Sequence, residues 1–185
     1  MEHIRTSIND LLTKKNRVVI AIDGKAAAGK TTLAKTLSAH YDSTWIPMDD
    51  FFLPKSLRTE ARFKEPGGNI HYEYFKTQVI DHLSNNQIKY QPFDCHVMAF
   101  KPSIKKPLKQ LIVIEGSYAL HPYFGKYYDL SIFVDIHPDV QFERIIKRNT
   151  QDQAQMFINR WIVYETRYQN HYDIENQVDI KYQTT

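Results

Sequence analysis

The sequence lacks the features that mark several classes of protein. Its 185 residues contain one cysteine, Cys95, so an intrachain disulfide is excluded and a reducing compartment is expected. No apolar run approaches the ~18 residues that cross a bilayer, and the N-terminus lacks the apolar core of a signal peptide. These absences predict a cytoplasmic protein with no membrane partner.

Neither the net charge nor the spacing of the histidines indicates a nucleic-acid partner or a metal site. The net charge is only +3, and no dense Lys/Arg block indicates nucleic acid. The basic stretch 101–109 is broken by prolines and resembles a solvated loop. His71, His96 and His121 lack the spacing of metal ligands, so a zinc site is not expected. The mild basicity would suit a ligand that carries phosphate.

The most informative segment that is present is Gly24-Lys25-Ala26-Ala27-Ala28-Gly29-Lys30-Thr31. It matches G-x-x-x-x-G-K-[ST], the loop that wraps the phosphates of ATP or GTP. The two glycines let the backbone aim N–H groups at phosphate oxygens. Lys30 would reach the β- and γ-phosphates, and the Thr31 hydroxyl would bind Mg²⁺. Thr32 belongs to the helix that starts here, whose N-terminal partial charge also faces the anion.

The surroundings of the loop support this interpretation. The run 17–22 is short and rich in β-branched residues, which is typical of a buried parallel strand. After the loop, Leu33, Ala34 and Leu37 fall on one face of a helix. The sequence therefore predicts that the chain binds a nucleoside phosphate.

Strands and helices alternate along the rest of the chain. This pattern predicts a single domain, residues 1–185, with a three-layer α/β fold and a parallel sheet. An amphipathic helix is expected to precede the first strand. Further strands are expected at 43–47, 111–114, 130–134 and 178–180, and helices at 72–83, 140–146 and 157–168.

Two segments, 51–69 and 90–109, interrupt the alternation with prolines and glycines. Long irregular segments in a compact domain are usually functional or mobile, so we interpret both as walls of an acceptor-substrate site. Phe51 and Phe52 are expected to touch a substrate ring. Trp161, Tyr164 and Tyr168, which stand at helical spacing, are expected to be core.

Four carboxylates follow predicted strands, where open parallel sheets bind ligands. Glu115 ends the third strand and is our choice, with Thr31, for a Mg²⁺ ion, which takes only one or two carboxylates. Asp49 is the best candidate to accept the proton of a hydroxyl. For Asp50 a catalytic role and a cap for the next turn both stay open. Asp23 is expected to anchor the loop.

Cations are also needed for the charge that develops on a transferred phosphoryl group. Arg144 and Arg148 stand four residues apart on a predicted helix and so share a face, whereas Lys147 lies off it. Arg148 is our candidate for this role, with a solvated helix face as the alternative.

Four segments together resemble one family: Ile22-Asp23-Gly24, Met48-Asp49-Asp50-Phe51-Phe52, Glu65-Pro66-Gly67-Gly68-Asn69 and Ile114-Glu115-Gly116. They resemble the uridine kinase-like group of P-loop small-molecule kinases, which includes nicotinamide riboside kinases and phosphoribulokinase. The resemblance implies a five-stranded parallel sheet, a mobile lid and ATP-dependent phosphorylation of a hydroxyl, typically on a nucleoside. It also implies Asp49 as the catalytic base.

Two departures from the family pattern bear on the substrate. His71 stands where an aspartate typically holds ribose hydroxyls, and residues 149–159 contain no Arg or Lys, unlike the arginine-rich lid of uridine kinases. On the resemblance we assign the acceptor to Asp49, Phe52, His71, Asp94 and Arg167.

The sequence thus predicts an enzyme that uses ATP and Mg²⁺ to phosphorylate a nucleoside or a similar small metabolite. The same chemistry on nicotinamide riboside or a non-nucleoside alcohol stays open, as does a nucleotide-binding regulator with little turnover. The sequence also leaves open a homo-oligomer.

Overall fold

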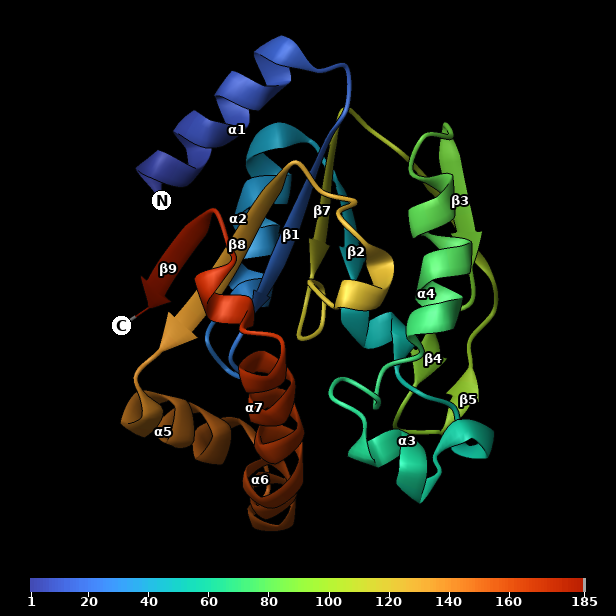
Figure 1. The fold of residues 1–185 in the computed structure, drawn as a ribbon, viewed down its shortest axis with the longest axis vertical. Helices are drawn as coiled ribbons and strands as arrows, with labels where there is room; N and C mark the ends of the chain where they lie inside the picture. The colour runs from blue at the N-terminus through green and yellow to red at the C-terminus, as the bar shows by residue number, and fades with distance from the viewer. Residues whose placement is uncertain (185) are drawn as a thin grey trace.

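A five-stranded parallel sheet forms the centre of the computed structural model, which describes residues 1–184 (Figure 1). Its strand order is β2-β7-β1-β8-β9. The strands are β1 Val18–Gly24, β2 Thr44–Pro47, β7 Leu111–Glu115, β8 Leu130–Ile136 and β9 Ile180–Thr184. Strands β1 and β7 are buried throughout, because their apolar residues are covered on both faces. The predicted α/β architecture is confirmed.

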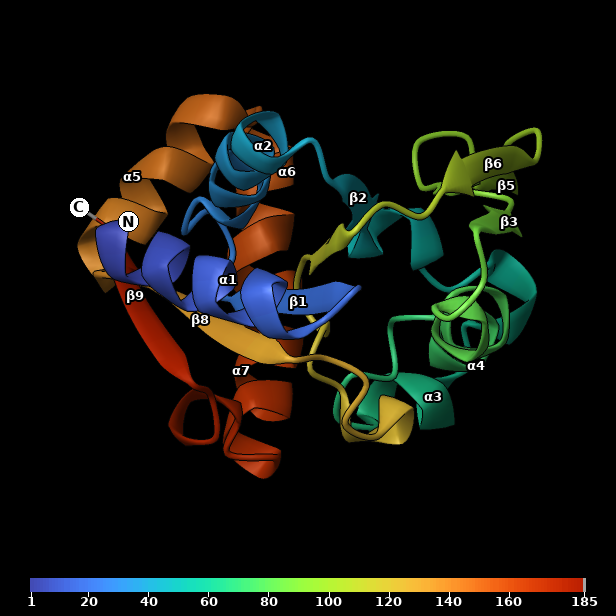
Figure 2. The ribbon, with the colours of Figure 1, turned by 90° about the horizontal axis from the view of Figure 1, so that it is seen from above.

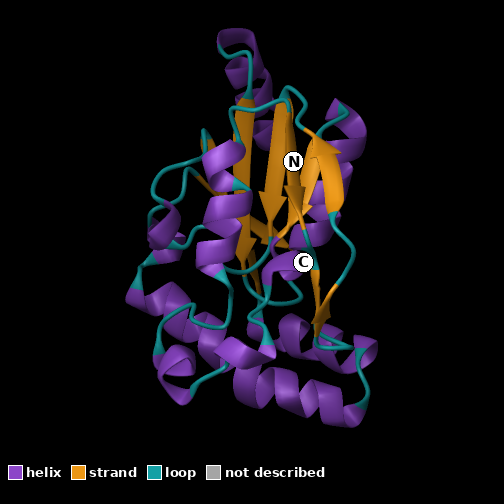
Figure 3. Cartoon of the chain, turned by 90° about the vertical axis from the view of Figure 1, so that its right-hand side faces the viewer, coloured by secondary structure: helices purple, strands orange, loops and turns teal. Residues whose placement is uncertain are grey.

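Helices cover both faces of this sheet (Figure 3). On one face, α1 (Glu2–Lys14) and α2 (Lys30–Tyr41) bury a cluster that includes Ile8 and Leu37. On the other, α4 (Tyr72–Gln78) and α7 (Ile162–His171) contribute Phe75 and Tyr168 to a second cluster. None of the helices within residues 1–184 is long and apolar enough to cross a bilayer.

The helical region after β8 differs from the prediction. Helix α5 spans Pro138–Arg148, and a second helical run begins at Gln151, six residues earlier than expected. That run consists of α6 (Gln151–Met156), a π-helical turn (Phe157–Trp161) and α7. Thr150 starts it with a capping box, in which the Thr150 hydroxyl and the Gln153 side chain each accept the other's backbone N–H.

The two segments expected to be irregular contain short elements. Segment 51–69 holds α3 (Glu60–Lys64). Segment 90–109 folds back on itself, because β6 (Ile104–Pro107) pairs with β3 (Gln87–Tyr90), and β4 (Phe93–Asp94) pairs with β5 (Ala99–Phe100). Figure 2 shows these pairs beside α4, away from the central sheet. The helix expected over 72–83 ends at Gln78 and is followed by a 3₁₀ turn.

Candidate active site

The order of the strands brings the predicted catalytic residues to one edge of the sheet. Strand β7 lies between β2 and β1, and all three run parallel. Asp49 lies in the 3₁₀ turn after β2, Glu115 is the last residue of β7, and Gly24 is the last residue of β1. Three segments far apart in sequence therefore meet at the carboxyl edge, where open parallel sheets bind ligands.

The loop after β1 depends on its two glycines. Gly24 has φ +141°, and a Cβ there would lie 2.1 Å from the carbonyl oxygen of Val134 in the neighbouring strand. Gly29 has φ +97° and is the N-cap residue directly before α2. Both backbone conformations are ones that residues with a Cβ rarely adopt. The first amides of α2, from Lys30 onward, have no partner within the helix and face an incoming anion.

Lys30 lies beneath the loop and is nearly buried. Its Nζ donates to the carbonyl oxygens of Gly24 at 2.7 Å and Lys25 at 2.9 Å. The side chain of Lys25 turns to Asp135, with which it forms an ion pair at 2.6 Å. Lys30, and not Lys25, is therefore held under the phosphate loop.

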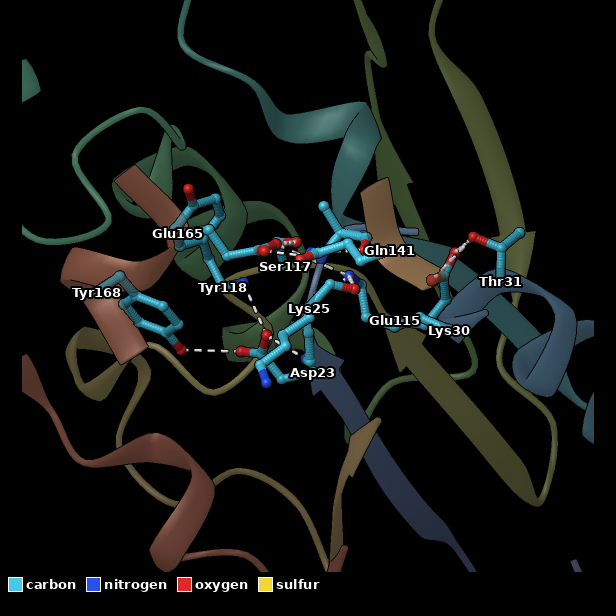
Figure 4. Close-up of polar contacts among 12 residues, drawn as sticks. Asp23, Lys25, Lys30, Thr31, Glu115, Ser117, Tyr118, Gln141, Glu165 and Tyr168 are labelled. Carbon is cyan, nitrogen blue, oxygen red and sulfur yellow. Dashed lines mark hydrogen bonds and ion pairs between the residues drawn. The ribbon is translucent and has the colours of Figure 1, made fainter. Parts of the chain in front are cut away.

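Asp23 anchors the loop from below, as the sequence predicted. Its carboxylate is fully buried and accepts hydrogen bonds from the Gly24 N–H at 2.7 Å and the Leu120 N–H at 3.1 Å. The Tyr168 hydroxyl donates to it at 2.9 Å (Figure 4). Burial raises the pKa of Asp23 to about 6, although Lys30 and these hydrogen bonds oppose the shift.

Thr31 and Glu115 face each other across the loop. The Thr31 hydroxyl lies 3.2 Å from both carboxylate oxygens of Glu115 (Figure 4). Burial, followed by the charge of Asp49, raises the pKa of Glu115, while Lys30 lowers it. A buried carboxylate and a hydroxyl, both oxygen ligands, suit a hard divalent cation such as Mg²⁺.

Asp49 and Asp50 have different surroundings. Asp49 is exposed at the wall of the cavity. Desolvation by the surrounding protein raises its pKa, Asp50 adds to the shift, and Lys30 and Arg148 oppose it. Asp50 instead accepts a hydrogen bond from the buried Tyr90 hydroxyl at 2.8 Å, which indicates a structural role.

Helix α5 presents three cations to the same cavity: Arg144, Lys147 and Arg148. Lys147, which was expected to lie off the face shared by Arg144 and Arg148, also lines the cavity. Arg144 donates to the carbonyl oxygen of Ala27 at 3.2 Å and so supports the loop. Arg148 lies over the ring of Phe157, with its Cζ 5.1 Å from the centroid.

These groups line one cavity of about 1320 Å³. Its phosphate-loop wall includes Ala26, Ala27, Ala28, Gly29, Lys30, Thr31 and Thr32. Its other wall comes from Asp49 and from the two segments 51–69 and 90–109, which contribute Phe52, Arg58, Asn69, Cys95 and His96. A nucleotide and a small acceptor can share this space.

Three residues assigned to the acceptor do not line the cavity. The ring of His71 stacks on Tyr74. Asp94 pairs with Lys101 at 3.0 Å, and Arg167 donates to the carbonyl oxygen of Phe63 at 3.1 Å. The structure therefore brings Asp49 and Phe52 to the cavity and leaves His71, Asp94 and Arg167 outside it. The expectation that Phe51 touches a substrate is wrong, because its ring is buried in the core.

Sequence reasoning missed Glu165, a nearly buried residue of α7. Its Oε2 accepts the Ala26 N–H at 2.7 Å, its Oε1 is hydrogen-bonded to the Ser117 hydroxyl, and Lys30 Nζ lies 3.9 Å away (Figure 4). The Gln141 Nε2 of α5 donates a hydrogen bond to the Ala26 carbonyl oxygen at 2.9 Å. The segment Glu165-Thr166-Arg167-Tyr168 resembles the C-terminal helix of the uridine kinase-like group, but the local sequence gives Glu165 no role, because its partner Ala26 is 139 residues away.

Trp161 was expected to be core, as was Tyr168. Tyr168 is buried, but Trp161 lines the cavity. Both residues do lie in one continuous helical run. The π-helical turn that ends at Trp161 changes the direction of the Trp161 side chain relative to the side chains of α7.

Comparison with known proteins identifies the family of the chain. Residues 19–173 match the model of the phosphoribulokinase / uridine kinase family. The chain is 32% identical to a uridine kinase of Clostridium botulinum (strain Kyoto / Type A2) over 149 residues, which are 75% of this chain and 70% of that protein. The chain belongs to the phosphoribulokinase and uridine kinase family. It is therefore a P-loop small-molecule kinase.

Solved structures of the family share this fold. A possible uridine kinase from Bacillus stearothermophilus superposes with a TM-score of 0.70 at 22% identity, covering 98% of this chain and 100% of that one. Phosphoribulokinase from Rhodobacter spheroides gives 0.60 at 14% identity, covering 91% and 70%. As a member of this kinase family the chain is an ATP-dependent enzyme, and the cavity described above is its candidate active site.

Proposed function

We propose that this kinase transfers the γ-phosphoryl group of ATP to a hydroxyl of a nucleoside or a similar small alcohol, with Asp49 as the base. The observation that carries the proposal is the shared cavity of Asp49, Lys30, Thr31 and Glu115. The alternative of a regulator without turnover is disfavoured because all four groups face one space.

Each residue has a defined part in the transfer. The acceptor hydroxyl oxygen forms a bond to the γ-phosphorus while the bond from that phosphorus to the β–γ bridging oxygen breaks, and ADP leaves. The hydroxyl proton passes to the Asp49 carboxylate. The loop amides and Lys30 hold the phosphates, and Arg148 stabilises the charge that develops on the transferred group.

Thr31 and Glu115 are the residues that would hold Mg²⁺. The bound ion would neutralise charge on the phosphates. The buried carboxylate of Glu115, next to the Thr31 hydroxyl, supplies oxygen ligands that fit such an ion.

The test is a coupled assay of ADP release across nucleosides and other small alcohols, with the phosphorylated product identified by mass spectrometry. We expect a product that depends on both ATP and the acceptor. Tight ATP binding without product from any acceptor would instead favour the regulator.

The pH dependence of transfer provides a second prediction. Asp49 acts as a base only when deprotonated, and its pKa is raised. We therefore expect kcat/KM for the acceptor to fall on the acid side at a pH above the range of an ordinary aspartate, which is about 4. The measurement is a pH–rate profile at saturating ATP. ATP affinity measured over the same range is the control, because burial also raises the pKa of Glu115. A profile that stays flat down to about pH 4 would contradict the assignment.

A further inference from the structure

Arg58 is a cation of the acceptor wall that has no acidic partner. It lies in the segment between β2 and α3 and lines the cavity. Its Nε donates to the carbonyl oxygen of Leu53 at 2.7 Å, and its Nη2 lies 3.9 Å from Cys95 Sγ. No ion pair within residues 1–184 includes it. The guanidinium is held in place, and most of its N–H groups stay available to a ligand.

The carboxylates on this side of the cavity are already committed. Asp94 pairs with Lys101, and Asp50 accepts the Tyr90 hydroxyl. Asp49 is the proposed base. Asp49, Arg58 and Cys95 line the same cavity, and the Arg58 Nη2 lies 3.9 Å from the Cys95 Sγ. The reacting end of an acceptor and Arg58 are therefore within the reach of one small molecule.

The charges around the cavity also favour an acceptor with negative charge. Six cationic side chains line it: Lys30, Arg58, Arg144, Lys147, Arg148 and Arg160. Three carboxylates line it: Asp49, Glu115 and Glu165. An ATP–magnesium complex brings roughly two negative charges. A positive excess is left after the nucleotide binds, and it attracts an acceptor of negative charge.

The position of His71 disfavours an uncharged ribose diol as the group that binds this wall. A carboxylate that binds the ribose diol is implied at that position by the family resemblance, but His71 lies outside the cavity. Asp49 is then the only carboxylate on the acceptor wall within residues 1–184. An uncharged polyol would find few hydrogen-bond acceptors there, whereas a guanidinium matches a carboxylate or a phosphate.

We propose that Arg58 binds a carboxylate or phosphate group of the acceptor, so that the substrate is a small alcohol with negative charge away from its reacting hydroxyl. This inference rests on the proposed function and narrows its substrate class.

Matched acceptors test the proposal. Nicotinate riboside and nicotinamide riboside differ in a carboxylate, and ribose 5-phosphate and ribose differ in a phosphate. We expect the anionic member of at least one pair to be phosphorylated with a kcat/KM at least about tenfold higher, consistent with one charge-assisted contact. The pair that responds identifies the anionic group.

Substitutions at Arg58 then test the residue itself. Arg58→Gln should lower kcat/KM for the preferred anionic acceptor about tenfold, mainly through KM, with KM for ATP unaltered. Arg58→Lys should restore part of the loss. Lys55→Gln, an exposed cation on the same segment that does not line the cavity, is the matched control and should have no effect.

The outcomes separate this inference from the proposed function. Equal or better use of the neutral members, or an equal effect of Arg58→Gln on both members of a pair, would overturn the role of Arg58 alone. If no acceptor is turned over, the proposed function is wrong for these compounds. The pairs are then compared by calorimetry on protein saturated with a non-hydrolysable ATP analogue. Anionic members that bind no tighter than neutral ones would overturn the Arg58 subsite.

Discussion

The Asp49→Asn substitution is expected to lower the turnover number about a thousandfold, within the range that a general base contributes. An asparagine keeps the size of the side chain but cannot accept the hydroxyl proton. The loop, Lys30 and Thr31 are untouched, so we expect ATP to bind with nearly the same affinity. The measurements are single-turnover transfer and the dissociation constant for ATP.

The neighbouring residue supplies the control. Asp50→Asn weakens the hydrogen bond from Tyr90, so we expect a loss of thermal stability without a comparable loss of transfer. If Asp49→Asn transferred phosphoryl groups as fast as the unchanged protein, the acceptor proton would have to leave by another route, and the proposed role of Asp49 would be refuted.

The Glu165→Ala substitution is expected to reduce kcat/KM for ATP by about 10- to 100-fold. Glu165 is a positioning residue: its buried carboxylate accepts the Ala26 N–H and the Ser117 hydroxyl. Its removal leaves both donors without a partner, at a cost of about 1–3 kcal/mol. The loss should appear in KM for ATP because the phosphate loop loses its fixed shape.

Two further variants separate positioning from general stability. Glu165→Gln keeps an oxygen that can accept the Ala26 N–H, so we expect it to recover much of the ATP affinity. Glu143→Ala removes an exposed carboxylate of α5 and should change neither KM nor the melting temperature. If Glu165→Ala melted earlier but bound ATP normally, Glu165 would serve the fold and not the loop.

Local residue types were enough to predict the phosphate loop and most of the sheet. The glycine spacing at 24 and 29, together with the apolar runs before and after it, requires only neighbouring residues to be interpreted. The same holds for Glu115, which directly ends a buried strand. The predicted helix over 157–168 was less accurate, because a π-helical turn joins two α-helices there and helical periodicity does not register the change.

The acceptor side could be predicted only as a region. Segments 51–69 and 90–109 do supply the cavity wall, as expected, but the assignment of individual residues needed coordinates. The ring of His71 packs on Tyr74, and Arg58, which the sequence did not single out, takes a place on the wall. Loop residues follow no period, so the direction of each side chain depends on contacts made at long range.

By itself the sequence determined that the chain is an α/β protein with a nucleotide-binding loop, a candidate base at Asp49 and a candidate metal ligand at Glu115. Tertiary structure alone decided that Glu165 of α7 accepts the Ala26 N–H and that Asp50 accepts the Tyr90 hydroxyl. It also decided that Arg58 and Lys147 line the cavity. The reason is physical. Backbone turns and strands form from residues near one another in sequence, whereas a binding site forms where distant segments pack, and packing leaves no period in the chain.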